Sequence, residues 1–157
     1  MKVAASVKSF AAALAPVARV APGKATIPIL SHVLVEAGAG DGLSLVANDL
    51  DREAEGFAAA RVARQGAACF PAATLLDILK KLPADAEVAI DLEPADGNAR
   101  ATLRCGRARF LLPTLPAEDF PRLAQAEFSH RFALAAKDVA RALASVAWAI
   151  SNEETRY

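Results

Sequence analysis

Apolar residues along this chain follow two spacings, one typical of strands and one typical of helices. The two spacings succeed one another in an order that is repeated once. Stretches with alternating apolar and polar residues predict strands, and stretches with apolar residues three or four positions apart predict helices. The order is strand, helix and three strands, twice, followed by one strand and one helix, which predicts an α+β fold. The predicted strands are 1–7, 30–37, 43–47, 52–62, 67–70, 87–92, 99–104, 107–112 and 128–134, and the predicted helices are 8–20, 71–82 and 136–150.

The repeat also predicts where the domains divide. Two βαβββ units occupy roughly 120 residues, which is a common size for a domain. We therefore expect one domain over residues 1–123, and the first strand and helix of a second, truncated domain over residues 124–157. The strands that would cover the apolar face of the last helix are missing from the sequence. We expect this helix to fold back on the first domain, to be mobile, or to be covered by another chain.

Composition excludes several classes of protein. The 157 residues are 54% hydrophobic and 23% charged, which excludes an intrinsically disordered chain. No apolar run approaches the ~18 residues of a membrane-spanning helix, and the first residues do not resemble a secretion signal. The two cysteines, Cys69 and Cys105, form no CxxC motif. These features predict a reduced, cytoplasmic protein.

The charges are balanced overall, with 18 basic and 18 acidic residues, but they are not evenly distributed. The predicted helices contain only two acidic residues, Asp77 and Asp138, against six basic ones: Lys8, Arg19, Lys80, Lys81, Lys137 and Arg141. Cationic helices in a neutral protein indicate a face that meets a polyanion, although ordinary solvated helix faces would look similar. Lys24, in a Pro-Gly loop, is a further exposed cation.

A second basic cluster lies around Cys105-Gly106, which we expect to be a two-residue hairpin turn. This turn would pair Arg104 with Arg107 and bring four arginines to one face of the sheet: Arg100, Arg104, Arg107 and Arg109. Four like charges repel one another unless an anion offsets them. Nucleic acid, the acidic edge of a protein, and plain solvation remain open as explanations.

The sequence contains no convincing active site. Asp49, Asp51, Glu53 and Glu55 form an acidic cluster that could indicate a metal-dependent nuclease. Acidic residues at alternate positions are, however, also typical of a solvated sheet face. His32 and His130 are isolated, and no phosphate-binding, dinucleotide, nucleophile-elbow or zinc motif is present. We therefore expect no catalytic residue, no metal and no cofactor.

Several short segments resemble the bacterial DNA polymerase III beta subunit family, the sliding clamps. They are TIPILS at 26–31, LSLVANDLD at 43–51, FPA at 70–72, LPAEDFP at 115–121 and AISNEETRY at 149–157. The resemblance implies a DNA-clamp fold of three domains, each a duplicated βαβββ unit. It also implies a processivity factor for DNA replication in which two subunits close head to tail around duplex DNA. Helices would line the hole, with antiparallel sheets outside.

The resemblance also implies roles for individual residues. Lys24 matches a basic loop residue that touches DNA in the family, and the other expected DNA contacts are Lys80, Lys81, Lys137 and Arg141. Ala73 and Thr74 occupy positions where the family often has basic residues, which makes contacts there doubtful. The four hairpin arginines would face an acidic third domain of the neighbouring subunit. Arg156 and Tyr157 would begin the pocket for partner peptides.

The implied partners are duplex DNA, bound without sequence preference, the polymerase III catalytic subunit and the clamp loader. Family members form a homodimeric ring. Three domains of roughly 120 residues each need well over 300 residues, so we do not expect this chain to close a ring by the usual route. The alternative is an interaction module or decoy that does not encircle DNA and binds clamp or replisome partners through the arginine hairpin.

Overall fold

The computed structural model describes residues 1–157 except 24, 39, 41, 94–98, 124–128 and 152–157. The chain divides into two compact units, Met1–Leu123 and Ala124–Tyr157. The first unit contains two helices, α1 (Val7–Val17) and α2 (Ala72–Lys81), and a short 3-10 helix, Pro28–Ser31. Its strands are β1 (Lys2–Ser6), β2 (His32–Ala37), β3 (Gly42–Asn48), β4 (Glu53–Arg64), β5 (Gly66–Pro71), β6 (Glu87–Leu92), β7 (Arg100–Cys105) and β8 (Ala108–Pro113).

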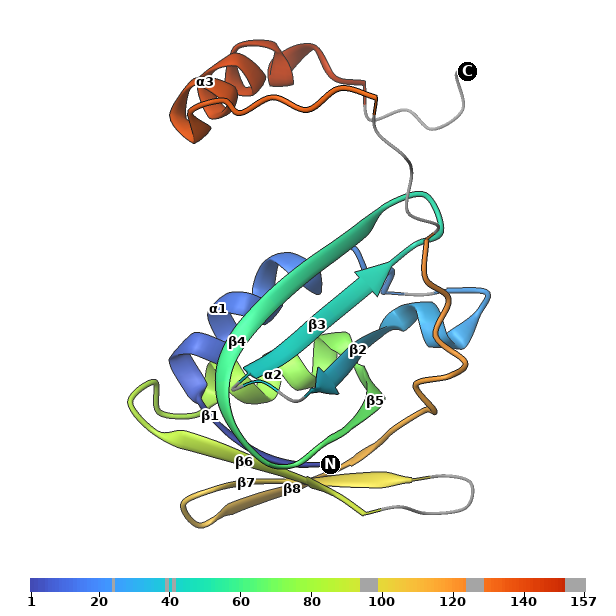
Figure 1. Ribbon diagram of the computed structural model, residues 1–157, viewed down its shortest axis with the longest axis vertical. Coiled ribbons are helices and arrows are strands. Elements are labelled where there is room, and N and C mark those ends of the chain that lie inside the picture. The colour runs from blue at the N-terminus through green and yellow to red at the C-terminus, as the bar shows by residue number, and fades with distance from the viewer. Residues whose placement is uncertain (24, 39, 41, 94–98, 124–128, 152–157) are drawn as a thin grey trace. The chain divides into compact units, whose positions relative to one another are not determined.

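All eight strands belong to one antiparallel sheet with the order β5-β2-β3-β4-β1-β6-β7-β8. The long strand β4 pairs with β3 through its first half and with β1 through its second half (Figure 1). The first strand of each repeat pairs with the second strand of the other repeat, β1 with β6 and β5 with β2. The two repeats therefore exchange strands, which makes them a single domain.

The two ends of this sheet also meet. Cys69 in β5 and Leu115, just after β8, exchange backbone hydrogen bonds of 2.9 and 3.0 Å. This bridge is the counterpart, in the second repeat, of the pairing between β1 and β4. The sheet is thus nearly closed, which leaves few unpaired backbone groups at its edges.

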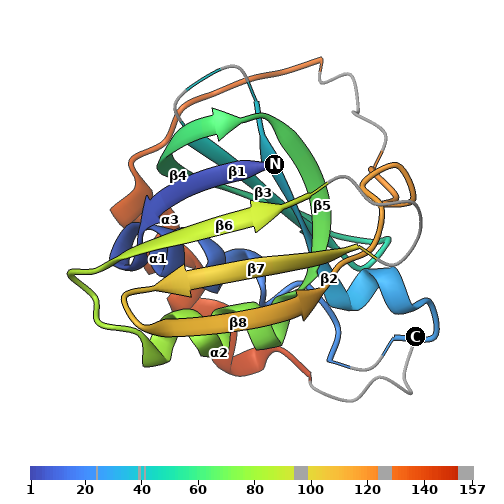
Figure 2. The same ribbon diagram turned by 90° about the horizontal axis from the view of Figure 1, so that it is seen from below.

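The core lies between the sheet and the two helices, which contact each other. Helix α1 contributes Phe10 and Leu14, and helix α2 contributes Leu75 and Leu79, all at helical spacing and fully buried. Alternate strand residues, such as Val3 in β1, point to the same core because successive side chains of a strand face opposite sides. In Figure 2, β6, β7 and β8 lie in front of α1 and α2, so one face of the sheet carries the helices.

The opposite face of the sheet has a small apolar cluster of its own. Ile29, Leu34, Val46 and Cys69 are buried there beneath Phe120. The segment that follows β8 therefore crosses back over β2, β3 and β5 and covers this part of the sheet.

The second unit differs from the sequence-based expectation. Its described residues form helix α3 (Ala136–Val146) and a 3-10 turn, Ala147–Ala149. The strand expected at 128–134 is wrong over its described part, because residues 129–134 pair with no other strand. A strand needs a partner to satisfy its backbone groups, and the described part of this unit contains none. Among the described helices, none is long and apolar enough to cross a membrane.

Candidate nucleic-acid interface

Helix α2 presents a basic end to solvent. Its apolar residues Ala72, Leu75 and Leu79 are buried, and the polar positions on its other side, Thr74 and Asp77, are exposed. Lys80 and Lys81 occupy the last turn and are both exposed. A cation in the last turn also stabilises a helix, because it lies near the negative end of the helix dipole. The two lysines therefore have a local structural role in addition to any contact with a ligand.

Helix α1, which contacts α2, exposes Lys8 in its first turn, and Arg19 follows its last residue. No carboxylate of the described residues lies within 4.0 Å of Lys8, Arg19, Lys80 or Lys81. Other basic side chains do form ion pairs, namely Arg52, Arg61, Arg64 and Arg122, but the arginines of the hairpin, like the helix cations, form none within the described residues. The charges on the helix side are therefore available to an external anion.

The other expected site residues lie in the second unit or outside the described residues. Lys137 and Arg141 lie on α3 in the second unit, where both are exposed and Arg141 pairs with Asp138 at 3.3 Å. Lys24, Arg156 and Tyr157 lie outside the described residues. Ala73 and Thr74, where the sequence departs from the family pattern, are exposed in the first turn of α2.

The arginine hairpin forms, with one correction. The turn is Gly106-Arg107 rather than Cys105-Gly106, so Arg104 pairs with Arg109 and not with Arg107. Cys105 is buried and continues β7, while Gly106 takes the left-handed φ of +55° that the turn requires. Arg100, Arg104 and Arg109 share the exposed face as expected, whereas Arg107 projects from the turn itself. Because β8 is the last strand of the sheet, this basic hairpin lies at an edge.

The acidic cluster has a structural role. The Asp49 carboxylate accepts hydrogen bonds from the backbone N–H groups of Asp51 and Arg52, at 3.1 and 2.8 Å, and closes the turn between β3 and β4. The hydrogen bond from the Arg52 backbone, followed by that from its side chain, lowers the pKa of Asp49. Arg122 binds Glu36, Glu53 and Glu55 at 3.5, 3.8 and 2.9 Å. No group of metal-ligating side chains was found in the described part of the chain.

Two further side chains that could take part in chemistry, Cys69 and His32, are buried or partly buried and have structural contacts. Burial, with smaller contributions from Asp119, Glu118 and Glu36, raises the pKa of the Cys69 thiol to about 12, so this thiol stays protonated. Burial lowers the pKa of His32, whose Nδ1 lies 3.0 Å from the carbonyl oxygen of Pro28.

The role of Arg122 could not be found from the sequence, because the three carboxylates that it binds come from strands far away along the chain.

Comparison with known proteins agrees with this architecture. Residues 1–124 match the family described as "DNA polymerase III beta subunit, N-terminal domain". The chain belongs to this family. It is 44% identical to the beta sliding clamp of Caulobacter vibrioides over 147 residues, which are 92% of this chain and 38% of that protein. It is 36% identical to the beta sliding clamp of Escherichia coli K12 over 140 residues, 86% of this chain and 36% of that protein.

Solved sliding-clamp structures share the fold. A crystal structure of the Caulobacter crescentus beta sliding clamp, with polyethylene glycol bound to a putative beta-motif tethering region, superposes with a TM-score of 0.93 at 38% identity. That comparison covers all of this chain and 41% of the clamp. The expected α+β DNA-clamp fold is confirmed. The chain spans about two fifths of the length of these relatives.

Proposed function

We propose that this chain supplies the first domain of a sliding clamp, a processivity factor that encircles duplex DNA and tethers the replicative polymerase. The observation that carries the proposal is the set of exposed cations on and next to two helices in contact: Lys8 on α1, Arg19 just beyond it, and Lys80 and Lys81 on α2. These four cations have no carboxylate partner within the described residues. Family membership supports the proposal independently.

The mechanism needs no catalytic residue. Lysine and arginine contacts to phosphates are weak, independent of sequence and sensitive to salt, so a protein held by them can slide along DNA. Retention on DNA would come from ring closure, in which the arginine hairpin meets an acidic edge of a neighbouring subunit.

The partners of the protein would be duplex DNA, the polymerase III catalytic subunit and the clamp loader. The protein would act in the cytoplasm. Lys24, Lys137 and Arg141 would add DNA contacts, and Arg156 and Tyr157 would border the partner-peptide pocket.

The proposed DNA surface can be tested through the salt dependence of binding. Titrating the protein onto a labelled 30-bp duplex (about three helical turns) gives the slope of log K against log salt concentration. Each phosphate contact contributes about −0.9 to this slope. Replacing Lys80 and Lys81 with Gln should therefore make the slope shallower by about 1.8.

The matched control replaces Arg61 and Arg64 with Gln, which removes two charges from the sheet side. It should leave the slope unchanged. Equal slopes for the wild type and the Lys80 and Lys81 variant would contradict a DNA-facing role for helix α2.

A second candidate function is an interaction module that binds an acidic protein edge without encircling DNA. The hairpin arginines favour it, because Arg104 and Arg109 lie directly opposite each other at the end of the sheet. Reversing the charge of Arg107 and Arg109 to Glu should abolish binding to a full-length sliding clamp in native mass spectrometry, because both residues project from the hairpin. DNA binding should remain intact. Loss of DNA binding instead would assign the hairpin to nucleic acid.

A further inference from the structure

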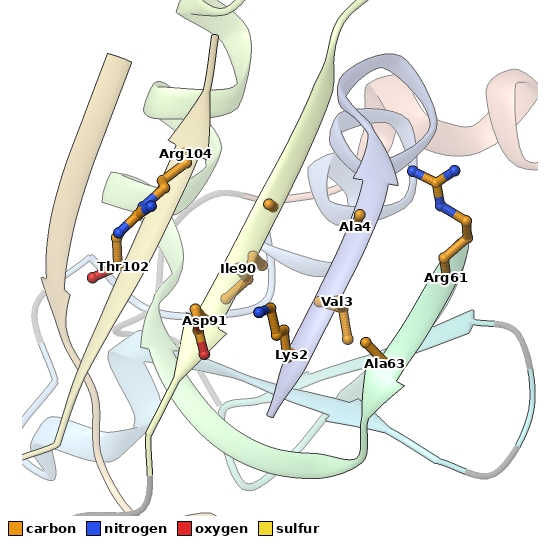
Figure 3. A pocket seen from close by; sticks show the side chains of 10 residues that line it. Lys2, Val3, Ala4, Arg61, Ala63, Ile90, Asp91, Thr102 and Arg104 are labelled. Carbon is orange, nitrogen blue, oxygen red and sulfur yellow. The ribbon is translucent and has the colours of Figure 1, made fainter. Parts of the chain in front are cut away.

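The face of the sheet opposite the helices contains a shallow hollow of about 310 Å³ across β4, β1, β6 and β7. We call it the outer-face trough and define it by its floor of Ala4, Ala63 and Ala89 and its polar rim of Lys2, Arg61, Asp91, Thr102 and Arg104. Figure 3 shows that the rim side chains come from different strands, with Arg104 and Arg61 on opposite sides of the trough. The helix surface assigned above to DNA lies on the other face.

The strand register explains why a hollow exists here. Across five neighbouring strands, one row of outward-facing residues reads Arg109, Arg104, Ala89, Ala4 and Arg61. Residues paired in this way project to the same side, with about 5 Å between neighbouring Cβ atoms. Two alanines in the middle of the row are too short to fill the space between the arginines. The result is an apolar floor between basic walls.

The trough also has an excess of positive charge. The two carboxylates of this part of the sheet are already engaged, Glu87 with Arg61 at 2.6 Å and Asp91 with Arg64 at 3.1 Å. For Lys2, Arg104 and Arg109, the described residues provide no carboxylate within 4.0 Å. Arg104 and Arg109 are moreover directly opposite, an arrangement that is destabilising for like charges. An external anion placed here would relieve this repulsion.

We propose that the outer-face trough docks an extended acidic peptide segment of a partner protein, with the pattern acid-x-apolar-x-acid. The two acids would bind Arg104 and Lys2, and the apolar side chain between them would lie on Ala4 and Ala89. Positions 1, 3 and 5 of an extended peptide face one side and span about 13 Å. Arg104 and Lys2 lie two strands and two residues apart, which corresponds to about 12 Å. The spacing of the peptide and that of the trough therefore agree.

The charge pattern favours an acidic peptide over nucleic acid. Glu87 and Asp91 stand among the cations of this face, and they would repel a continuous phosphate backbone. A peptide can present two carboxylates separated by an uncharged stretch. Its apolar side chain would also remove the alanine floor from water. This inference goes beyond the proposed clamp function: its site lies on the sheet face rather than the helix face and shares Arg104 with the arginine hairpin.

The test uses fluorescence anisotropy of the full 157-residue chain with the labelled peptide Asp-Ser-Leu-Ser-Asp. Replacing Lys2 and Arg104 with Gln should weaken binding at least about tenfold, because both ionic contacts are lost. Two control variants, Lys8→Gln and Arg107→Gln, remove a charge outside the trough and should bind as the wild type does. Circular dichroism verifies that each variant is folded. If the double variant is not folded, the single substitutions Lys2→Gln and Arg104→Gln are used in its place.

Three control ligands complete the design. The neutral peptide Asn-Ser-Leu-Ser-Asn should not bind, and Asp-Ser-Ser-Leu-Asp, in which leucine faces the other side, should bind more weakly. Duplex DNA should not displace the peptide. The proposal is overturned if the acidic peptide does not bind at millimolar concentration, if the Lys2 and Arg104 variants bind as tightly as the wild type, if either control peptide binds equally well, or if duplex DNA displaces the peptide.

Discussion

Gly56 shows how one residue sets the distance between a helix and a strand. A Cβ atom at this position in β4 would lie 2.8 Å from the carbonyl oxygen of Ala13 and 2.9 Å from Cγ2 of Val17, both in α1. A backbone carbonyl cannot rotate away as a side chain can. Any larger residue would therefore force the helix off the sheet.

We expect Gly56→Ala to lower the free energy of unfolding by about 1–3 kcal/mol, the usual cost of overpacking. The measurement is urea denaturation followed by circular dichroism. Gly38→Ala is the matched control, because a Cβ there meets nothing within 4 Å, and it should change stability by less than about 0.5 kcal/mol. Equal stability of the two variants would show that α1 can shift at little cost.

At the scale of elements, the segment Pro121–Leu123 is tied to the sheet by several polar contacts. Asn48 Nδ2 donates a hydrogen bond to the carbonyl of Pro121, and the Leu123 N–H donates to Glu53 at 3.1 Å. Arg122 lies between these contacts and binds three carboxylates, from Glu36 in β2 and from Glu53 and Glu55 in β4. The acidic cluster thus holds the end of the first unit in place.

Replacing Arg122 with Met should lower the free energy of unfolding of residues 1–123 by about 1 kcal/mol. A single exposed ion pair contributes little to stability, but here three carboxylates would lose the cation that they share. The loss should shrink in about 1 M NaCl, which screens the repulsion among the carboxylates. Arg100→Met, at an exposed arginine that forms no ion pair within the described residues, should have no comparable effect. The measurement is urea denaturation at low and high salt, and an equal loss at both salt concentrations would contradict an electrostatic role.

At the scale of the whole chain, the two units differ in how much they bury. The first has a continuous core, whereas every described residue of the second, from 129 to 151, is exposed. Helix α3 has 11 residues, and isolated helices shorter than about 12–15 residues are only marginally stable in water. The apolar side of α3, with Val139, Leu143 and Val146, therefore contributes nothing to a core of its own.

This difference predicts independent unfolding. Trp148 is the only tryptophan and is 86% exposed, so its fluorescence should change gradually with urea. Circular dichroism should show the cooperative transition of residues 1–123. Iodide should quench Trp148 equally below and above that transition. A sigmoidal fluorescence change at the same midpoint would show that the two units unfold together.

Much of the first domain follows from local pattern. The residues of β6 and the amphipathic face of α2 are predicted correctly, because the period of apolar residues depends on neighbouring positions alone. The same alternation correctly puts Arg100, Arg104 and Arg109 on one face, since a register shift of two residues does not change which side they face. The location of the turn depends on one backbone conformation at Gly106, and the sequence analysis placed it one residue too early.

The sequence by itself determined the order of strands and α-helices in the first unit, the sides of its strands that face the core, and the basic character of the helices. Only the tertiary structure decided which strands pair, such as β1 with β6 and β5 with β2, and which charges remain without partners. Two features join residues that are far apart in the chain. One is the set of ion pairs between Arg122 and three carboxylates, and the other is the trough between Lys2 and Arg104. The physical reason is that periodicity is a local property of the sequence, whereas ion pairs and surface hollows depend on the register of strands that meet only in the folded chain.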